Sequence, residues 1–228
     1  MDLPELLQAA KSGDIDEVRR LHIKGADLNQ THKNGASALI YAAENDHMEI
    51  VQYLIENGAD PSLQTKMGAT ALNRAAENGN VGMIKYLLEN GTPVGDLALI
   101  MAAREGHTEA VKLLIDAGAD VNSQQRWGQT ALMLAAREGH NEVVKLLLDH
   151  GANVRLKDKN GETALNIALD NDNTDIVLQL RRAGARAEIK RKKVEVSPDD
   201  EDEETSDEID ELVSDDTDEI PEDLDLED

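Results

Sequence analysis

The sequence predicts an all-α solenoid, a stack of helix pairs, over about the first 188 residues. Two independent landmarks recur in one register. An Ala-Leu pair recurs with offsets of 33, 27, 33 and 33 residues, at Ala38-Leu39, Ala71-Leu72, Ala98-Leu99, Ala131-Leu132 and Ala164-Leu165. A glycine recurs in the same pattern, with offsets of 33, 33, 27, 33 and 33 residues, at Gly25, Gly58, Gly91, Gly118, Gly151 and Gly184. A fixed period of this length is typical of a tandem array in which each unit is one supersecondary element.

The unit itself reads as two helices. Its clearest copy begins after Gly128, where Thr130 is placed to cap a helix whose apolar residues follow at helical spacing. Gly139 ends that helix, since glycine readily takes the left-handed conformation. A second helix follows with a wide apolar surface, formed by Val143, Val144, Leu146, Leu147 and Leu148. One helix pair cannot bury this surface alone, so neighbouring units must cover it.

Small residues explain how the core packs without aromatic bulk. The chain has no Phe and only 2% aromatic residues, yet paired alanines recur at positions 42–43, 75–76, 102–103 and 135–136. Their small side chains let the helices of successive units approach closely.

The Gly-x-Thr-x-Leu-x-x-Ala-Ala and Gly-Ala-Asp signatures at a period of about 33 residues resemble the ankyrin repeat. The resemblance covers residues 1 to about 188. It implies that each unit carries a projecting, hairpin-like finger. It also implies that protein partners bind the fingertips and the inward face of the first helices.

The register divides the chain into six repeats and two further segments. The repeats are 1–33, which acts as an N-terminal cap, then 34–66, 67–94, 95–126 and 127–159, and 160–188, which acts as a C-terminal cap. Residues 189–198 form a basic linker, and residues 199–228 form an acidic segment that we expect to be disordered.

The two caps are predicted from polar residues where inner repeats are apolar. Glu5, Gln8 and Lys11 make the outer face of the first unit polar, and Gln179 and Arg181 replace two leucines of the preceding unit. A terminal repeat needs such a face because no neighbour covers it.

The connection before the fourth repeat is short. Gly128 follows Gly118 by ten positions, but Gly95 follows Gly91 by only four. We therefore predict a missing finger between the third and fourth repeats. Two interpretations stay open: a neutral deletion in a tolerant loop, or a gap that fits a partner.

No catalytic or metal site is predicted. The chain has no Cys, which excludes thiol chemistry, and its glycines form no phosphate-binding loop. His47, His107 and His140 share one column of the repeat, and other units place Asp or Asn there. We expect that column to lie in the turn between the helices and to hydrogen-bond the backbone. The sequence predicts no enzyme and no cofactor.

Charge is concentrated at one end. Residues 199–228 contain 19 of the 47 acidic residues and no Lys or Arg, so the repeats together with the basic linker carry 28 acidic and 23 basic residues. Apolar residues such as Ile209 and Leu224 are scattered among the acids. The acidic segment could only solvate the protein, recruit a basic partner or fold back on the basic fingertips.

The candidate partner-binding residues lie at the fingertips and on the first helices. By the resemblance, the fingertip positions are Lys33, Asn34, Lys66, Met67, Arg126, Trp127, Lys159 and Asn160. The inner-helix positions are Glu44, Asn45, Glu77, Asn78, Arg104, Glu105, Arg137 and Glu138.

Two fingertip features go beyond the repeat pattern. Trp127 is the single Trp of the chain, and large aromatics are frequent anchors of binding energy. Its ring either anchors a partner or lies over the next finger. The basic row of Lys33, Lys66, Arg126 and Lys159 either attracts a partner or serves solubility.

These observations predict a non-catalytic scaffold or adaptor that binds a protein partner through the concave groove and the fingertips, with the acidic segment as a second or regulatory site. The alternative is an inhibitor or nucleic-acid mimic whose acidic segment engages a basic partner. Direct nucleic-acid binding is not expected, because the acidic segment repels phosphate. No segment has the roughly 20 apolar residues that span a bilayer. We expect a monomer in the cytoplasm, or in the nucleus if the source is eukaryotic.

Overall fold

The computed structural model describes residues 3–186, and the described chain is entirely helical apart from turns and loops. The helices are α1 (Glu5–Ser12), α2 (Ile15–Ile23), α3 (Ala38–Glu44), α4 (Met48–Glu56), α5 (Ala71–Glu77), α6 (Val81–Glu89), α7 (Asp96–Arg104), α8 (Thr108–Asp116), α9 (Ala131–Glu138), α10 (Asn141–Asp149), α11 (Ala164–Asp170) and α12 (Thr174–Arg182). The predicted all-α repeat solenoid is confirmed. The basic linker and the acidic segment lie outside the described residues.

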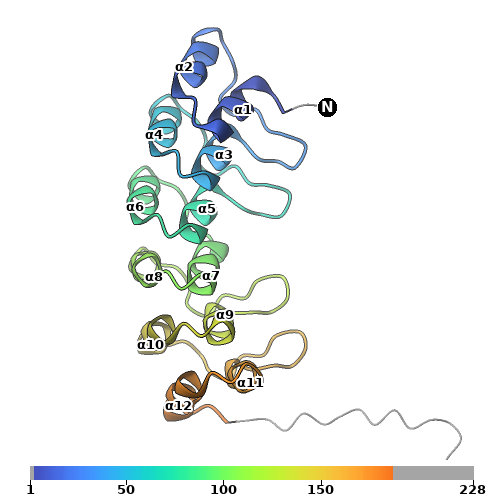
Figure 1. The fold of residues 1–228 in the computed structure, drawn as a ribbon, viewed down its shortest axis with the longest axis vertical. Helices are drawn as coiled ribbons and strands as arrows, with labels where there is room; N and C mark the ends of the chain where they lie inside the picture. The colour runs from blue at the N-terminus through green and yellow to red at the C-terminus, as the bar shows by residue number, and fades with distance from the viewer. Residues whose placement is uncertain (1–2, 187–228) are drawn as a thin grey trace, which may run out of the picture. The chain divides into compact units, whose positions relative to one another are not determined.

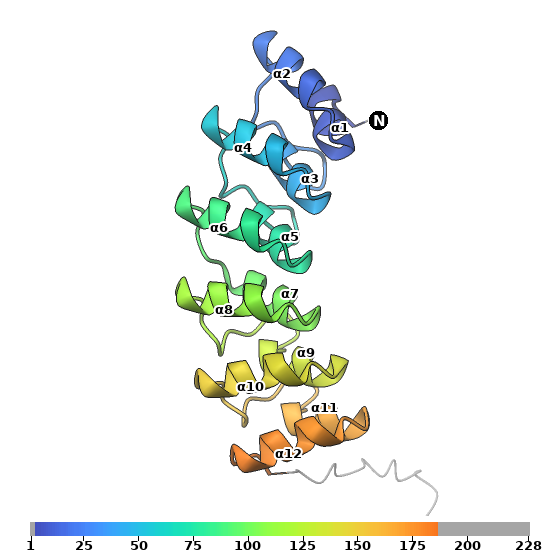
Figure 2. The same cartoon turned by 60° about the vertical axis from the view of Figure 1, so that its left-hand side comes forward.

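Helix pairs stack in two columns. The first helices of the repeats form one column, and the second helices form another column beside it (Figures 1 and 2). Within the first column α1, α3, α5, α7, α9 and α11 pack against one another in this order. Each pair contacts the pairs before and after it. These contacts join the described residues 3–186 into one compact unit.

Alanines form the contact layer between first helices. Ala42 and Ala43 of α3, and the equivalent pairs in α5, α7 and α9, are completely buried. The second helices fill the space behind them with larger groups, such as Ile84 and Leu87 of α6. The core is therefore one continuous layer that runs along the stack, as the small-residue pattern predicts.

Hydroxyl side chains begin most of the first helices. The side chains of Ser37, Thr70, Thr130 and Thr163 each accept a hydrogen bond from the backbone amide three residues later. Such a bond satisfies one amide that the helix itself leaves unpaired. Helix α7 differs, because its N-cap is Gly95, which offers no side chain.

The turn between paired helices needs a left-handed residue. Gly79, Gly106 and Gly139 supply it in three repeats, with φ between 68° and 83°. Asp46 takes the same position with φ of 58°, and Asp172 does so with φ of 57°. An aspartate tolerates this conformation better than most residues.

The connections between repeats have two lengths. Four of them hold fourteen residues each, and we call them finger 24–37, finger 57–70, finger 117–130 and finger 150–163. The connection between α6 and α7 holds only residues 90–95. Figure 1 shows the four fingers projecting beside the first helices, with none beside α7. Because the connection is short, α7 begins at Asp96, two residues before the Ala-Leu pair.

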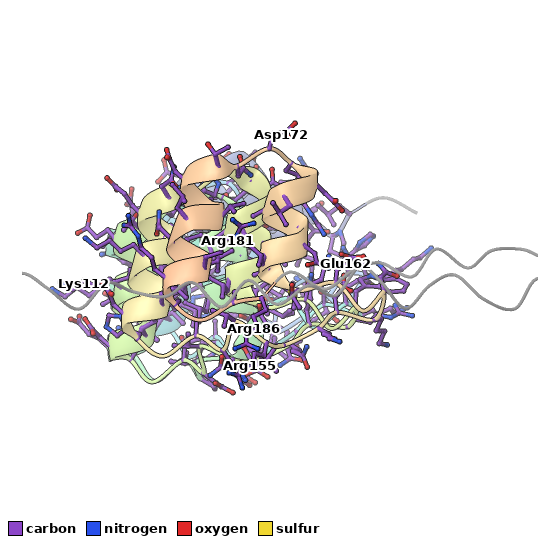
Figure 3. All side chains as sticks on the ribbon, turned by 90° about the horizontal axis from the view of Figure 1, so that it is seen from below. Lys112, Arg155, Glu162, Asp172, Arg181 and Arg186 are labelled. Atoms are coloured by element: carbon purple, nitrogen blue, oxygen red, sulfur yellow. The ribbon has the colours of Figure 1, made fainter. Side chains whose placement is uncertain are left out.

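The last described repeat ends in a mixed surface. Arg181 is exposed on α12, as the cap pattern predicts (Figure 3). Gln179 is half-buried and donates a hydrogen bond to the side-chain oxygen of Asn141 at 3.1 Å. Leu169 and Leu178 are 40% and 52% exposed. The face that ends the stack is thus polar at its rim and apolar at these two leucines.

Candidate protein-binding surface

Each long finger is built around the same tight turn. In finger 117–130 the amide of Gln125 donates to the carbonyl oxygen of Gln129 at 3.0 Å, and the amide of Gly128 donates back to Gln125 at 2.8 Å. Gly128 has φ of 76°, which suits glycine at this corner. The turn leaves the two residues before the glycine at the tip. All eight predicted fingertip residues are exposed there.

Neighbouring fingers are joined in pairs by backbone hydrogen bonds. The amide of Lys66 donates to the carbonyl oxygen of Asn34 at 2.7 Å, and the amide of Lys159 donates to that of Trp127 at 3.0 Å. Asparagines reinforce each pair. The side-chain oxygens of Asn29 and Asn122 accept from the amides of Asp60 and Asn153, at 2.8 and 2.7 Å. The fingers therefore form two rigid pairs, 24–37 with 57–70 and 117–130 with 150–163.

Two large apolar side chains project from the fingertips. Met67 is 76% exposed and Trp127 is 63% exposed. The guanidinium of Arg126 lies 5.7 Å from the centre of the Trp127 ring, within the range of a cation–π contact. The structure thus leaves most of the ring in solvent, where a partner can reach it.

The inner-helix candidates lie at the other end of the first helices. The four helices α3, α5, α7 and α9 end at inner-helix candidates, namely Glu44, Glu77, Arg104 and Glu138, whereas the fingers precede the helices. One helix of eight residues is roughly 12 Å long. The fingertip and inner-helix candidates therefore form two separate strips, which the structure does not bring together.

A charge network joins the third and fourth repeats on the inner strip. Arg104 contacts Glu77 of the preceding repeat and Glu105 of its own, each at 2.7 Å, and Arg74 contacts Glu77 at 2.7 Å. Hydrogen bonding to Glu105, aided by Glu77, raises the pKa of Arg104. Sequence reasoning missed Arg74, although its spacing of three residues before Glu77 is the signal that could have found it.

Other inner-strip candidates are partly used by the fold. The side-chain amide of Asn78 donates to the carbonyl oxygens of Ala43 and Glu44, at 3.3 and 3.1 Å, and so ties the third repeat to the second. Asn45 donates to the carbonyl of Tyr41 within its own helix at 2.8 Å. Glu44 and Glu138 are exposed at the surface of this strip, while Arg137 is half-buried.

The histidine column has the structural role that the sequence predicts. His47, His107 and His140 stand at the start of the second helices, and Nε2 of each lies 2.9–3.1 Å from a carbonyl oxygen of the preceding repeat. Asn173 uses the same place to donate to Ala136 at 2.8 Å. These side chains connect one repeat to the next across the turn.

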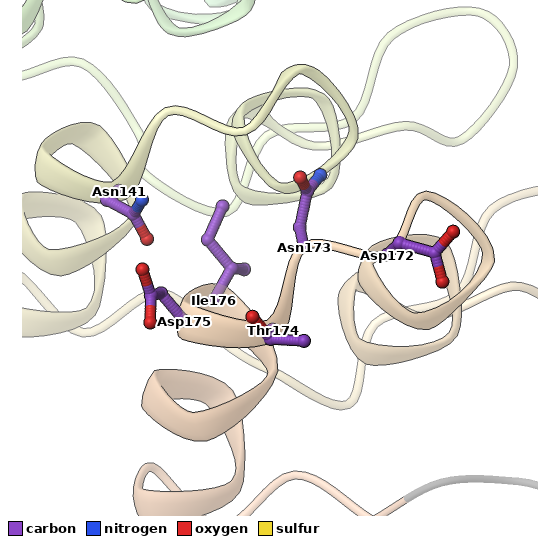
Figure 4. A pocket seen from close by; sticks show the side chains of 6 residues that line it. All are labelled: Asn141, Asp172, Asn173, Thr174, Asp175 and Ile176. Atoms are coloured by element: carbon purple, nitrogen blue, oxygen red, sulfur yellow. The ribbon is translucent and has the colours of Figure 1, made fainter.

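The hollows of the described surface are shallow and open. One of about 230 Å³ lies where the turn before α12 meets α10 and is lined by Asn141, Asp172, Asn173, Thr174, Asp175 and Ile176. Figure 4 shows the side chains of Asn141 and Asp175 pointing toward one another at its edge. Among residues 3–186, no three His, Asp or Glu side chains are grouped as a metal site requires. None of the helices in this range combines the length and apolar character needed to cross a bilayer.

This sequence and this fold have counterparts among known proteins. The sequence matches the family described as ankyrin repeats (3 copies) over residues 6–97 and 99–192. No curated protein sequence matches the chain.

Solved structures show the same stack. The structure of the Bd0816 predatory endopeptidase from Bdellovibrio bacteriovorus in complex with immunity protein Bd3460 contains a similar chain. It is 28% identical, with 80% of this chain and 99% of that chain covered and a TM-score of 0.71. The human ASB11 ankyrin repeat domain is 27% identical, with 81% of this chain and 85% of that chain covered and a TM-score of 0.73.

Proposed function

Since this chain belongs to the ankyrin repeat family, we propose that it is a non-catalytic scaffold or adaptor that holds a protein partner against its fingertips. The observation that carries the proposal is the exposure of Met67 and Trp127 on two fingers, each beside a basic residue. Trp and Arg side chains are the usual centres of binding energy at protein interfaces, and Trp127 lies beside Arg126.

The rigidity of the paired fingers supports this proposal. Lys66 is held to Asn34, and Lys159 to Trp127, by backbone hydrogen bonds. A partner that binds such preformed tips loses little free energy to ordering them. The inner strip, with Glu44 and Glu138 exposed, offers a polar rim to the same partner.

A second role falls to the acidic segment 199–228. Its 19 carboxylates in 30 residues would attract a basic partner at low ionic strength. The alternative function follows from this charge: an inhibitor or nucleic-acid mimic in which the acidic segment occupies the basic surface of its target.

Affinity capture from the source cell tests the proposal with three variants. The chain ending at residue 194 removes the acidic segment. The double substitution Met67→Ser and Trp127→Ala removes the exposed apolar fingertips. Ile23→Ser is the matched control, because Ile23 is 84% exposed on α2 but lies outside the fingertips.

The scaffold function predicts that the fingertip variant loses the partner, while the control and the shortened chain keep it. Loss of the partner with the shortened chain alone, together with release of the partner from the full chain at high salt, would favour the inhibitor function. Equal capture by all three variants would refute both.

A further inference from the structure

The row of fingers is broken between finger 57–70 and finger 117–130, and the break is bounded by backbone groups without partners. At the equivalent position in each finger pair, an amide of one finger donates to a carbonyl of the other. By register, the missing finger would donate to Met67 and accept from Arg126. Among the described residues, neither the carbonyl oxygen of Met67 nor the amide of Arg126 has a hydrogen-bond partner.

The side-chain hydrogen bonds between neighbouring fingers are also interrupted at the break. Asn29 and Asn122 tie their fingers to the next one, but the residue in register on finger 57–70 is Ser62. The hydroxyl of Ser62 donates to Asp60 of its own finger at 2.6 Å. The finger that faces the break therefore lacks the residue that would tie it to a following finger.

The floor of the break is the first turn of α7. Its N-cap, Gly95, is exposed and provides no capping side chain. Leu97 fills part of the floor, because its Cδ1 would lie 3.9 Å from a Cβ on Gly68. The hydroxyl of Thr92, in the short connection that precedes α7, is buried and has no hydrogen-bond partner among the described residues. The floor is thus formed without any projection that would close the break.

The two edges of the break have the same chemistry. Lys66 with Met67 forms one edge, and Arg126 with Trp127 forms the other, so each edge presents a cation and a large exposed apolar group. Repeats stack roughly 8–10 Å apart, so removing one finger leaves room for one turn of polypeptide of finger size. Cations on both sides favour a carboxylate in that turn, while Asp96 on the floor keeps the carboxylate toward the edges.

We propose that the break receives a hairpin-shaped loop of a protein partner that carries at least one Asp or Glu at its tip. This loop takes the place of the missing finger, donating an amide to Met67 and accepting from the amide of Arg126. The inference rests on the proposed function and specifies where and how the partner is held.

A disulfide-closed peptide tests the site. Its sequence is that of residues 150–163 with Lys157→Glu and Lys159→Glu, because the amide at position 159 already bonds a preceding finger in the native chain. Binding to the full chain is followed through the amide resonances of Gly68 and Arg126. The matched control peptide is methylated on the amide nitrogen of position 159 and so cannot donate.

A chain with a restored finger is the second control. Residues 90–95 are replaced by the fourteen residues of finger 117–130, which fills the break with the protein's own backbone. We expect the acidic peptide to shift Gly68 and Arg126, and we expect its dissociation constant to rise at least tenfold with N-methylation. The restored finger should abolish binding while the protein remains folded.

Several outcomes would overturn the proposal. One is equal binding of the N-methylated peptide or equal binding to the restored-finger chain. Slower amide exchange at Arg126 in the full chain than in a chain ending at residue 198 would assign the break to the protein's own acidic segment. A dimer that the restored finger dissociates would assign it to a second copy. If the restored-finger chain still captures the cellular partner, the break is not the site, although the scaffold function survives.

Discussion

The imidazole of His140 covers Gly106 so closely that a Cβ on this glycine would lie 2.6 Å from Cε1 of the ring. His107 covers Gly79 in the same way, with a shortest distance of 2.5 Å. Each ring also reaches a carbonyl oxygen of the preceding repeat. The contact between successive repeats thus depends on a residue without a side chain in one turn and a ring in the next.

Substitution of Gly106 should therefore lower the free energy of unfolding by more than the left-handed backbone conformation alone accounts for. Gly118 is the matched control, because it also has positive φ, at 95°, but nothing lies within 4 Å of an added Cβ. Each Gly→Ala change destabilises the fold by about 1–2 kcal/mol, because alanine must take the left-handed conformation. We expect Gly106→Ala to lose roughly 1–3 kcal/mol more through the clash with His140. Urea denaturation measures the difference, and equal losses would contradict the role of the ring.

The hydrogen bond of His140 can be tested by the residue that other repeats use. Asn173 donates to Ala136 from the same column, so His140→Asn should retain the link between repeats. His140→Ala should lose about 0.5–1.5 kcal/mol, because the carbonyl oxygen of Arg104 then lacks its partner. Urea denaturation of both variants measures the difference between their free energies of unfolding. An Asn variant as unstable as the Ala variant would show that the ring matters through packing alone.

Because the alanine layer is fully buried, we expect larger side chains in it to destabilise the fold. Ala103 is completely buried between first helices, and Ala103→Leu should destabilise the fold by roughly 1–3 kcal/mol. Ala117 is exposed at the end of α8, so Ala117→Leu should change stability little. Thermal unfolding followed by circular dichroism compares them, and a neutral Ala103→Leu would mean that the stack relaxes without cost.

Trp127 should matter for binding and not for stability. Its ring is 63% exposed, so Trp127→Ala should shift the free energy of unfolding by no more than about 0.5 kcal/mol. Capture of the protein partner should fall sharply and recover with Trp127→Phe, which keeps an aromatic surface. A large drop in melting temperature would instead place the ring in the packing of finger 150–163.

Asp60 provides a test by pH. Hydrogen bonds from the hydroxyl and the amide of Ser62 lower the pKa of the Asp60 carboxyl. A lowered pKa in the folded state stabilises the fold above the unfolded pKa, and this contribution disappears as the pH falls through the folded pKa. Ser62→Ala should move the pKa of Asp60 toward its usual value. NMR titration of the carboxyl carbon reports the change, and an unchanged pKa would assign the effect to the backbone amide.

Much of this fold can be predicted from the sequence, because the same short-range contacts recur in each repeat. Thr130 is recognisable as a cap from its place before an apolar run, and the structure shows its oxygen accepting from Met133 at 3.2 Å. The left-handed Asp46 follows from its column, which holds glycine elsewhere. Such features depend on residues within one turn, where the repeat register identifies the partner.

The candidate surface was harder to predict because its contacts cross between repeats. The pairing of Glu77 with Arg104 joins residues 27 positions apart, at the one irregular spacing in the chain. The exposure of Trp127 depends on how finger 150–163 lies beside it, and the sequence left both arrangements open. A column identifies which residues share a surface, but not which rotamer each side chain takes.

The neighbour-only contacts of the helix pairs also have a mechanical consequence. A tensile load applied along the column would pass through every interface in series, so extension would be shared among small, reversible separations before any pair lost its own helices. Such a stack would extend as a series of springs, and the two interfaces of α7, with α5 and with α9, would carry their share of the load through helix packing and side chains alone, because no finger pair of the described chain spans them.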